Sequence, residues 1–232
     1  MIPKKLHQTA KTSSLPEKWK AVQEKAIALH PNWTYTLWTD NDNEAFVEDS
    51  YPDLYPIYNE LPKPIMKADV ARYLHLHAFG GLYLDTDYEF LKPFDLLDYS
   101  IVLPRESEDS QPVFLGNCVM ASEPNHPFWI AVIDDLIQNP PSRNYNETEG
   151  SIIDLTGPGF LTRIYRDQFS TDSSIYIPSK DWFHPPTPRT LPEYTELAKD
   201  PKVYGIHFCF GSWRKLTLKE QVLRKLNRLW KV

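Results

Sequence analysis

The chain of 232 residues is long enough for one sizeable α/β domain with its own hydrophobic core. Hydrophobic residues make up 41% and charged residues 24%, a globular balance that excludes an intrinsically disordered chain. The net charge of −6 argues against nucleic acid as the main partner, because phosphate backbones attract basic surfaces.

The first sixty residues predict a β-α-β unit followed by short helices. Residues 2–9 alternate as a strand, a helix follows from residue 16 or 17 to residue 29 with Ser14 as its candidate N-cap, and residues 33–38 alternate again. Residues 40–60 are polar and predict only short helical pieces. A β-α-β unit starts a parallel sheet, and such sheets bind ligands, nucleotides among them, at the carboxyl ends of their strands.

The next segment places two acidic residues directly behind a buried strand. Residues 65–79 carry an apolar stripe with helical spacing, and Gly80-Gly81 ends the helix, since helix C-termini favour glycine at positive φ. Residues 82–84 form a short apolar strand that leads into Asp85-Thr86-Asp87.

The second half of the chain predicts further strands and helices. We expect strands near residues 100–104, 114–121 and 203–207, helices over residues 127–138 and from Thr156-Gly157 to about residue 167, and a proline-rich surface loop over residues 178–192. With no repeat or linker evident, residues 1–214 are predicted to form one domain and residues 215–232 a basic amphipathic helix.

The two cysteines and the polar N-terminal residues indicate in which cellular compartment the protein is expected. Cys118 and Cys209 are too few for a disulfide framework and lack the Cys-x-x-Cys spacing of zinc sites, and their apolar neighbours favour buried free thiols. Residues 1–6 turn polar at once and no long apolar run follows, so we expect a cytoplasmic protein without a signal peptide.

Asp85 and Asp87 predict a metal site. Two aspartates two positions apart at a strand end project to the same side, and no cation lies near them in the sequence. A bound Mg²⁺ or Mn²⁺ would relieve their repulsion, because these ions prefer oxygen ligands. An isolated Asp-x-Asp triplet is more often a solvated turn, but the apolar strand and glycine turn before this one favour a functional site.

Asp69 and Arg72 share one face of the preceding helix, away from its apolar stripe. Their spacing leaves two interpretations open. One is an exposed intrahelical salt bridge, which contributes little energy. The other is a pair that faces a cleft, where Asp69 accepts hydrogen bonds from sugar hydroxyls and Arg72 holds a donor oxygen.

Five segments in a fixed order resemble one known family. KADVARY at residues 67–73 and FGGLYLDTD at residues 79–87 carry most of the likeness, and residues 2–8, 33–40 and 206–213 match the two opening strands and a late segment that ends in Gly-Ser-Trp. The chain thus resembles glycosyltransferase family 32, whose sugar-binding region contains a DXD motif. The matched pieces span nearly the whole chain, so the resemblance is specific.

The resemblance implies a GT-A-type α/β fold, with a mixed, mainly parallel central sheet flanked by helices. It also implies a retaining hexosyltransferase that uses Mn²⁺ or Mg²⁺ and a UDP- or GDP-sugar. The acceptor would be a hydroxyl of an oligosaccharide or a lipid-linked sugar, of the capsule or lipopolysaccharide type.

The resemblance also implies roles for individual residues. Asp87, His207 and Asp85 would hold the metal, and Asp69, Arg72, Asp85 and Asp87 would be catalytic. The implied donor-binding residues are His7, Gln8, Trp38, Asp69, Arg72, Tyr83, Asp85, Ser212 and Trp213. Asn117, Thr156 and Gly157 would lie near the acceptor or the sugar.

The expected mechanism is same-face attack, in which the departing phosphate oxygen takes the proton of the acceptor hydroxyl. Two-carboxylate retention needs an acid and a nucleophile that flank the bond, and no such pair is evident, although Asp69 is a conceivable nucleophile.

Two other functions stay open at this point. A haloacid-dehalogenase-like phosphatase also places Asp-x-Asp after an apolar strand, but near the N-terminus and with Thr or Val soon afterwards, whereas Tyr88 and Glu89 follow here. A non-catalytic sugar-binding module with a calcium ion would need more oxygen ligands than this stretch offers.

The predicted basic helix at residues 215–232 has two interpretations. Its apolar side either packs on the domain or lies on an anionic membrane surface, where lipid-linked acceptors reside, as a peripheral contact at the inner face.

Overall fold

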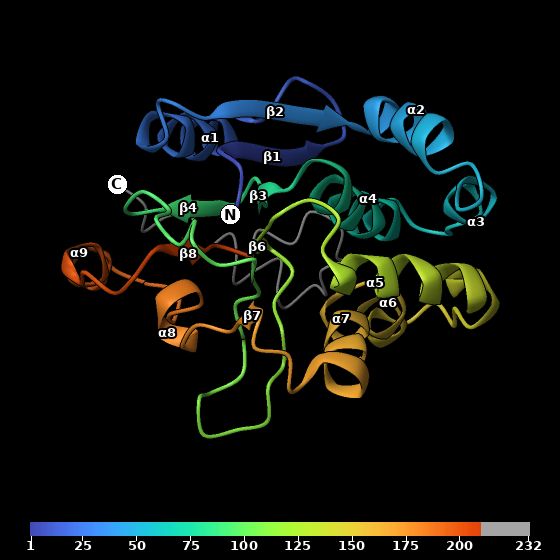
Figure 1. Ribbon diagram of the computed structural model, residues 1–232. Helices are drawn as coiled ribbons and strands as arrows, with labels where there is room; N and C mark the ends of the chain where they lie inside the picture. The colour runs from blue at the N-terminus through green and yellow to red at the C-terminus, as the bar shows by residue number, and fades with distance from the viewer. Residues whose placement is uncertain (210–232) are drawn as a thin grey trace.

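The computed structural model describes residues 1–209 (Figure 1). Ser212, Trp213 and the predicted helix at residues 215–232 lie outside the described residues, so the roles expected of them stay predictions.

A six-stranded mixed sheet forms the centre of the fold, with the strand order β2-β1-β3-β6-β5-β7. Three of its five pairings are parallel, namely β1 with β2, β1 with β3 and β5 with β7, while β6 is antiparallel to both β3 and β5. The predicted mixed, mainly parallel sheet is confirmed. The bounds are β1 (Lys5–Ala10), β2 (Thr34–Thr39), β3 (Gly81–Leu84), β5 (Ile101–Val102), β6 (Val119–Ser122) and β7 (Ile175–Tyr176).

Helices flank this sheet, and a separate ribbon of β4 (Tyr88–Phe90) and β8 (Gly205–His207) lies beside it. The helices are α1 (Glu17–Leu29), α2 (Asp40–Ser50), α3 (Tyr55–Asn59), α4 (Pro64–Phe79), α5 (Pro127–Gln138), α6 (Glu149–Leu155), α7 (Pro158–Ile164), α8 (Lys180–Phe183) and α9 (Leu191–Lys199), with a 3₁₀ turn at Pro141–Arg143 and a π turn at Tyr165–Phe169. Across residues 1–209, no helix combines the length and the apolar character that a membrane span requires.

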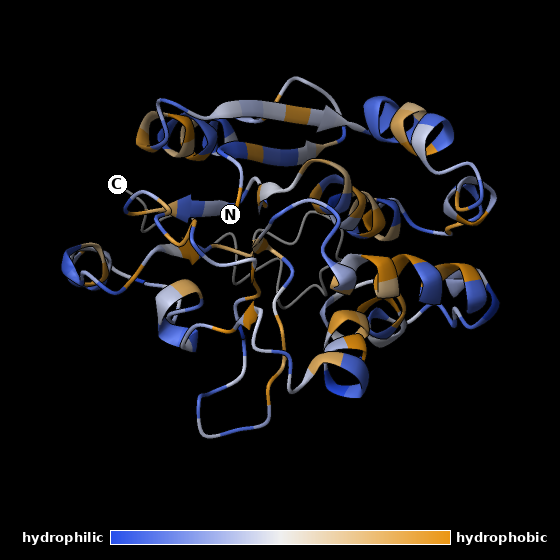
Figure 2. Cartoon of the chain, in the orientation of Figure 1, coloured by the Kyte–Doolittle hydropathy of each residue, from blue (hydrophilic) through white to orange (hydrophobic). Residues whose placement is uncertain are grey.

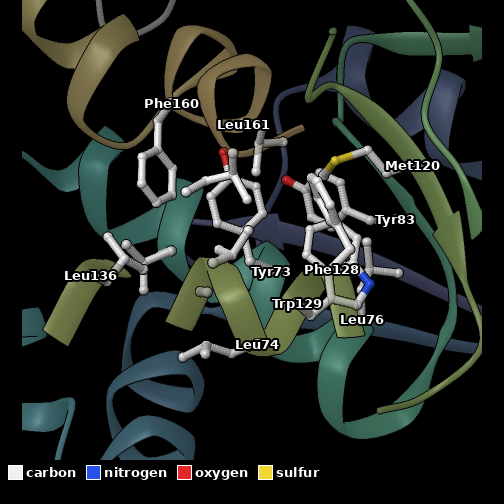
Figure 3. Close-up of a cluster of buried hydrophobic side chains, with 14 of the residues drawn as sticks. Tyr73, Leu74, Leu76, Tyr83, Met120, Phe128, Trp129, Leu136, Phe160 and Leu161 are labelled. Atoms are coloured by element: carbon white, nitrogen blue, oxygen red, sulfur yellow. The ribbon is translucent and has the colours of Figure 1, made fainter. Parts of the chain in front are cut away.

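Strand alternation divides the core into two clusters, because successive side chains of a strand point to opposite faces. Tyr83 of β3 and Met120 of β6 pack with α4, α5, α6 and α7 on one face. Leu82 and Leu84 point to the other face and pack with α1 and the β4–β8 ribbon. Figure 3 shows the first cluster, with the rings of Tyr73, Trp129 and Phe160 among its labelled side chains. In Figure 2, orange apolar bands alternate with blue polar bands along α5.

Most predicted elements are confirmed, including the β-α-β opening and the helix at residues 127–138. Ser14 is not the cap of α1, since the helix begins at Glu17 with Pro16 at the N-cap and without a side-chain cap bond. Ser14 lies too early in the chain for that role.

Three helices in the second half of the described chain, α6, α8 and α9, were not predicted from the sequence. Thr148 and Thr190 cap α6 and α9 by accepting hydrogen bonds from backbone N–H groups three residues on, a signal that the sequence does contain. The predicted surface loop at residues 178–192 includes α8, whose Phe183 is fully buried. Its prolines suggested a loop, yet a single buried aromatic ring anchors the segment to the core.

The glycine turn before β3 is confirmed in its geometry. Gly80 and Gly81 have φ of 59° and 96°. A Cβ on Gly81 would lie 2.6 Å from the carbonyl oxygen of Lys5, so β3 approaches β1 too closely for any side chain at this position.

We predict that Gly81→Ala lowers the free energy of unfolding by about 2–4 kcal/mol. The alanine would be strained at the positive φ of this position, and its Cβ would clash with the backbone of Lys5. Urea unfolding followed by circular dichroism measures the change. Gly150→Ala is the matched control, because it lies in α6 with ordinary φ and meets only Thr148 Oγ1 at 3.9 Å. Equal stability losses in the two variants would contradict the explanation.

Candidate active site

The candidate site lies where the parallel strands end. β1, β2 and β3 share a direction, so their carboxyl ends meet at one edge of the sheet, and Asp85 and Asp87 follow β3 there. Because β6 runs the opposite way, it begins at this edge and brings Asn117 and Cys118 to it. The backbone N–H of Asp85 donates to the carbonyl oxygen of Cys118 at 2.7 Å, which fixes the two segments together.

The β4–β8 ribbon brings His207 to the two aspartates. In its antiparallel register His207 faces Tyr88, the residue after Asp87. A Cβ on Gly205 would lie 2.5 Å from the carbonyl oxygen of Glu89, so glycine permits the close pairing. His207 Nε2 consequently lies 3.2 Å from Asp87 Oδ1, across 120 positions of sequence.

The geometry of these three side chains fits a divalent cation. One ligand atom from each of Asp85, Asp87 and His207 lies within 4.8 Å of the others. Their side chains are 23%, 16% and 21% exposed, so the group is open to the solvent side. Burial, and after it the negative charge of Asp87, raises the pKa of Asp85. Both effects disfavour the ionised carboxylate, and a bound cation would favour it. The two carboxylates of this group suit Mn²⁺ or Mg²⁺, which prefer oxygen ligands.

The surroundings of His207 act on its pKa in opposite directions. Burial by itself would lower its pKa, but the neighbouring Cys118 and the hydrogen bond to Asp87 raise it above its usual range. A metal ion bound at Nε2 of His207 would compete with a proton for that nitrogen.

Asp69 and Arg72 are buried, so the interpretation of an exposed salt bridge is wrong. Each is only 3% exposed. Arg72 Nη2 lies 3.2 Å from Asp69 Oδ1, its Nε donates to the carbonyl oxygen of Ala68, and its Nη1 donates to the carbonyl oxygen of Asn117 at 2.8 Å.

Arg72 also reaches the metal-binding group. Its Nη1 lies 3.2 Å from Asp85 Oδ1, and the same oxygen accepts a hydrogen bond of 2.8 Å from the Tyr83 hydroxyl. The guanidinium lies over the Tyr83 ring, 4.7 Å from its centroid. Arg72 and Tyr83 therefore both hold Oδ1 of Asp85 in place.

Asn117 and Thr156, predicted near the acceptor or sugar, both converge on Asp69. Asn117 Nδ2 donates to Asp69 Oδ1 at 2.9 Å, and Thr156 Oγ1 donates to Asp69 Oδ2 at 3.2 Å. Burial raises the pKa of Asp69 to about 7, against the opposing effect of Arg72. Gly157, by contrast, packs against the backbone of α6. A Cβ added to Gly157 would lie 3.1 Å from Ile153 Cα.

His7, Gln8 and Trp38, predicted to line a nucleoside pocket, use their polar atoms within the protein. Trp38 Nε1 donates to His7 Nδ1 at 3.2 Å, and His7 Nε2 lies 3.0 Å from the carbonyl oxygen of Gly80. Gln8 accepts from the Tyr35 hydroxyl and donates to the carbonyl oxygen of Asp85. Their nucleoside contacts stay a prediction.

A hollow of about 250 Å³ was not predicted from the sequence. It lies between α2, α3 and α4, and its lining residues are Asp40, Asn43, Glu44, Tyr58, Leu61, Pro64, Lys67 and Ala68. Within the described part of the chain, the buried Oδ1 of Asn43 has no hydrogen-bond partner.

Comparison with known proteins identifies relatives of this chain. Residues 16–104 match the family described as "Glycosyltransferase sugar-binding region containing DXD motif". The chain is 37% identical over 179 residues to inositol phosphoceramide mannosyltransferase 2 of Schizosaccharomyces pombe, covering 76% of this chain and 50% of that protein. It is 35% identical over 166 residues to a mannosyl phosphorylinositol ceramide synthase of Saccharomyces cerevisiae, covering 72% and 43%. The chain therefore spans about half the length of these curated relatives or less.

Solved structures share the fold. The UDP-bound glycosyltransferase domain of the YGT toxin gives a TM-score of 0.61 at 12% identity, covering 77% of this chain and 80% of that one. The PaToxG glycosyltransferase gives 0.57 at 18% identity, covering 73% and 70%. The expected GT-A-type fold is confirmed.

We predict that the protein loses stability as the pH falls from about 6.5 towards 4, partly because of His7. Burial lowers the pKa of His7 from 6.5 to about 4, so the folded state binds fewer protons than the unfolded state in this window. The stability is complete above pH 6.5 and is lost on acidification, by about 2 kcal/mol at pH 5 for this residue.

Urea unfolding at pH 7 and pH 5, on the wild type and on His7→Gln, measures this contribution. The variant should lose less stability between the two pH values than the wild type does. An identical loss in both proteins would exclude His7 as a cause.

Proposed function

The chain belongs to the glycosyltransferase family with a DXD-containing sugar-binding region, and we propose that it transfers a hexose from a nucleotide-diphospho-sugar to a hydroxyl of a glycolipid or oligosaccharide. The observation that carries this proposal is the convergence of Asp85, Asp87 and His207 in front of the buried Asp69–Arg72 pair. A cation held by these three ligands would suit a diphosphate, whose negative charge grows as the glycosidic bond breaks.

The metal-binding residues and the buried network have separate tasks in this proposal. Asp85, Asp87 and His207 would hold Mn²⁺ or Mg²⁺, which when bound supplies positive charge to the donor's diphosphate. Arg72, Tyr83 and Asp69 keep Asp85 in one orientation, so no reorganisation is required at the moment of reaction. Direct contacts of Asp69 and Arg72 with the sugar, which the family resemblance implies, would require some of their present partners to move away, because each residue is only 3% exposed.

The stereochemical course that we propose is retention by same-face attack. The acceptor oxygen bonds to the anomeric carbon while the bond to the phosphate oxygen breaks, and the departing phosphate oxygen takes the hydroxyl proton. Asp69 is poorly placed as a nucleophile, because it is nearly inaccessible and both of its oxygens accept hydrogen bonds or an ion pair.

The curated relatives refine the substrates that we propose. Their names specify mannosyl transfer to inositol phosphoceramide, so we propose a mannosyl donor and a phosphoinositol-containing lipid acceptor ahead of a capsule or lipopolysaccharide acceptor. A panel of GDP-mannose and UDP-hexoses with these acceptors, read out by mass spectrometry of the product, compares the alternatives directly. Transfer only to capsule or lipopolysaccharide oligosaccharides would reject the lipid acceptor.

The phosphatase interpretation is wrong, because the chain belongs to the glycosyltransferase family and has its GT-A-type fold. A non-catalytic sugar-binding module differs from our proposal in one measurable respect, the binding of a nucleotide together with a metal.

We predict that UDP or GDP, one more strongly than the other, raises the melting temperature only in the presence of Mn²⁺. At a hundred times its dissociation constant the nucleotide adds about 2.7 kcal/mol of stability. Asp87→Asn should abolish the metal-dependent part, while the exposed Asp167→Asn should leave it unchanged. The absence of any nucleotide-dependent shift in the wild type would favour the binding module.

We predict that Asp69→Asn lowers kcat by about 100-fold or more, because it removes the buried charge that holds Arg72. Its affinity for Mn²⁺, measured by electron paramagnetic resonance, should stay within a few-fold of the wild type, since Asp69 is not among the ligands. A loss of Mn²⁺ affinity as large as that of Asp87→Asn would place Asp69 in the metal site instead.

A further inference from the structure

A second group of metal-ligand side chains lies next to the candidate active site. One ligand atom from each of Glu106, Cys118 and His184 lies within 4.8 Å of the others. They come from three separate segments: the hairpin at residues 105–115, the residue before β6, and the residue that ends α8. The sequence spacing could not reveal this group, because no two of its members are close in the chain.

The distances within the group are those of a coordination shell. Cys118 Sγ lies 3.2 Å from His184 Nε2, which in turn lies 3.8 Å from Glu106 Oε1. Ligand bonds of about 2.0–2.3 Å around a tetrahedral ion place neighbouring ligand atoms at about these separations.

His184 is oriented for coordination. Its Nδ1 donates to the carbonyl oxygen of Arg105 at 2.9 Å, which leaves Nε2 unprotonated towards Cys118 and Glu106. Histidines that bind metals in proteins usually have their other ring nitrogen fixed in this way.

A glycine keeps space open beside the three ligands. A Cβ on Gly116 would lie 2.6 Å from His184 Cε1, 2.9 Å from His184 Nε2 and 3.0 Å from Glu106 Cγ. Gly116 has no positive φ, so its backbone conformation is open to other residues and the close approach of the ligands is what excludes a side chain.

We propose that Glu106, Cys118 and His184 bind one Zn²⁺ ion, distinct from the ion at Asp85, Asp87 and His207. The thiolate selects zinc over Mg²⁺ and Mn²⁺, which prefer oxygen ligands, and the imidazole is a common zinc ligand. On binding, Cys118 releases its thiol proton to solvent, and the charges of the thiolate and the Glu106 carboxylate then balance the two charges of the ion. A neutral complex suits this position, because Cys118 and His184 are buried.

The ion would fasten two peripheral segments to the edge of the sheet at the active site. Lys180 at the start of α8 already pairs with Glu108 of the hairpin, and its backbone N–H donates to Asp109. Cys118 joins this assembly to the segment whose carbonyl oxygen holds the N–H of Asp85. Zinc at this site would therefore have a structural role, separate from the proposed transfer reaction.

Cobalt(II) titration of the metal-free protein tests the proposal without using activity. Cobalt bound to a thiolate gives a near-ultraviolet charge-transfer band, and Zn²⁺ added in equimolar amount should abolish it. Cys118→Ser should eliminate the band, and Cys118→Ser and His184→Gln should each weaken Zn²⁺ binding by more than about 100-fold.

Two variants serve as controls. Cys209→Ser removes the other thiol, whose Sγ lies 3.3 Å from His207 Nδ1, and should keep the band. Asp87→Asn disables the first metal group and should also keep it. The melting temperatures of the metal-free variants verify their folding.

The proposal is overturned if the wild type shows no thiolate band. It is also overturned if Cys209→Ser eliminates the band, or if Asp87→Asn does so, because the cation would then belong to the first metal group. Failure of the nucleotide-dependent shift would leave this test unaffected.

Discussion

The structure depends on a buried guanidinium. Taking Arg72 out of water is costly, and the cost is met only because its N–H groups contact two carboxylates and two backbone carbonyl oxygens. These partners belong to α4, to the turn after β3 and to the segment before β6. One side chain thus fixes the relative positions of the helix and the two central strands, and with them the position of Asp85.

The candidate site has a buried part and a part that is open to solvent. The carboxylate of Asp69 lies at the back, where Asn117 and Thr156 saturate it, and Asp85, Asp87 and His207 lie in front. The two carboxylates of this front group carry more negative charge than His207 can balance, and a divalent cation would balance it. The zinc site that we propose adjoins the group through Cys118, so the same stretch before β6 would serve two metals of different chemistry.

Local signals account for the parts of the fold that the sequence predicted. The stripe on α4, the Gly80–Gly81 turn and the β3 strand are encoded within short windows, where periodicity and backbone preference decide the outcome. The α6 and α9 helices and the anchored α8 were missed because capping threonines and one buried ring are weak signals among prolines and polar residues. Cys209 was expected to be buried and is exposed, since it lies beyond the last described strand, whereas the buried Cys118 was correctly expected.

The sequence by itself determined the family and the GT-A-type fold, because the motifs and their order can be recognised along the chain. It also predicted a metal site at Asp85 and Asp87, because two aspartates directly follow an apolar strand. Tertiary structure alone decided that Asp69 and Arg72 are buried and that they brace Asp85. It also decided that Asn117 and Thr156 serve Asp69, and that Glu106, Cys118 and His184 meet. Burial and distance between remote segments depend on how strands pair and helices pack, and no spacing in one sequence specifies them.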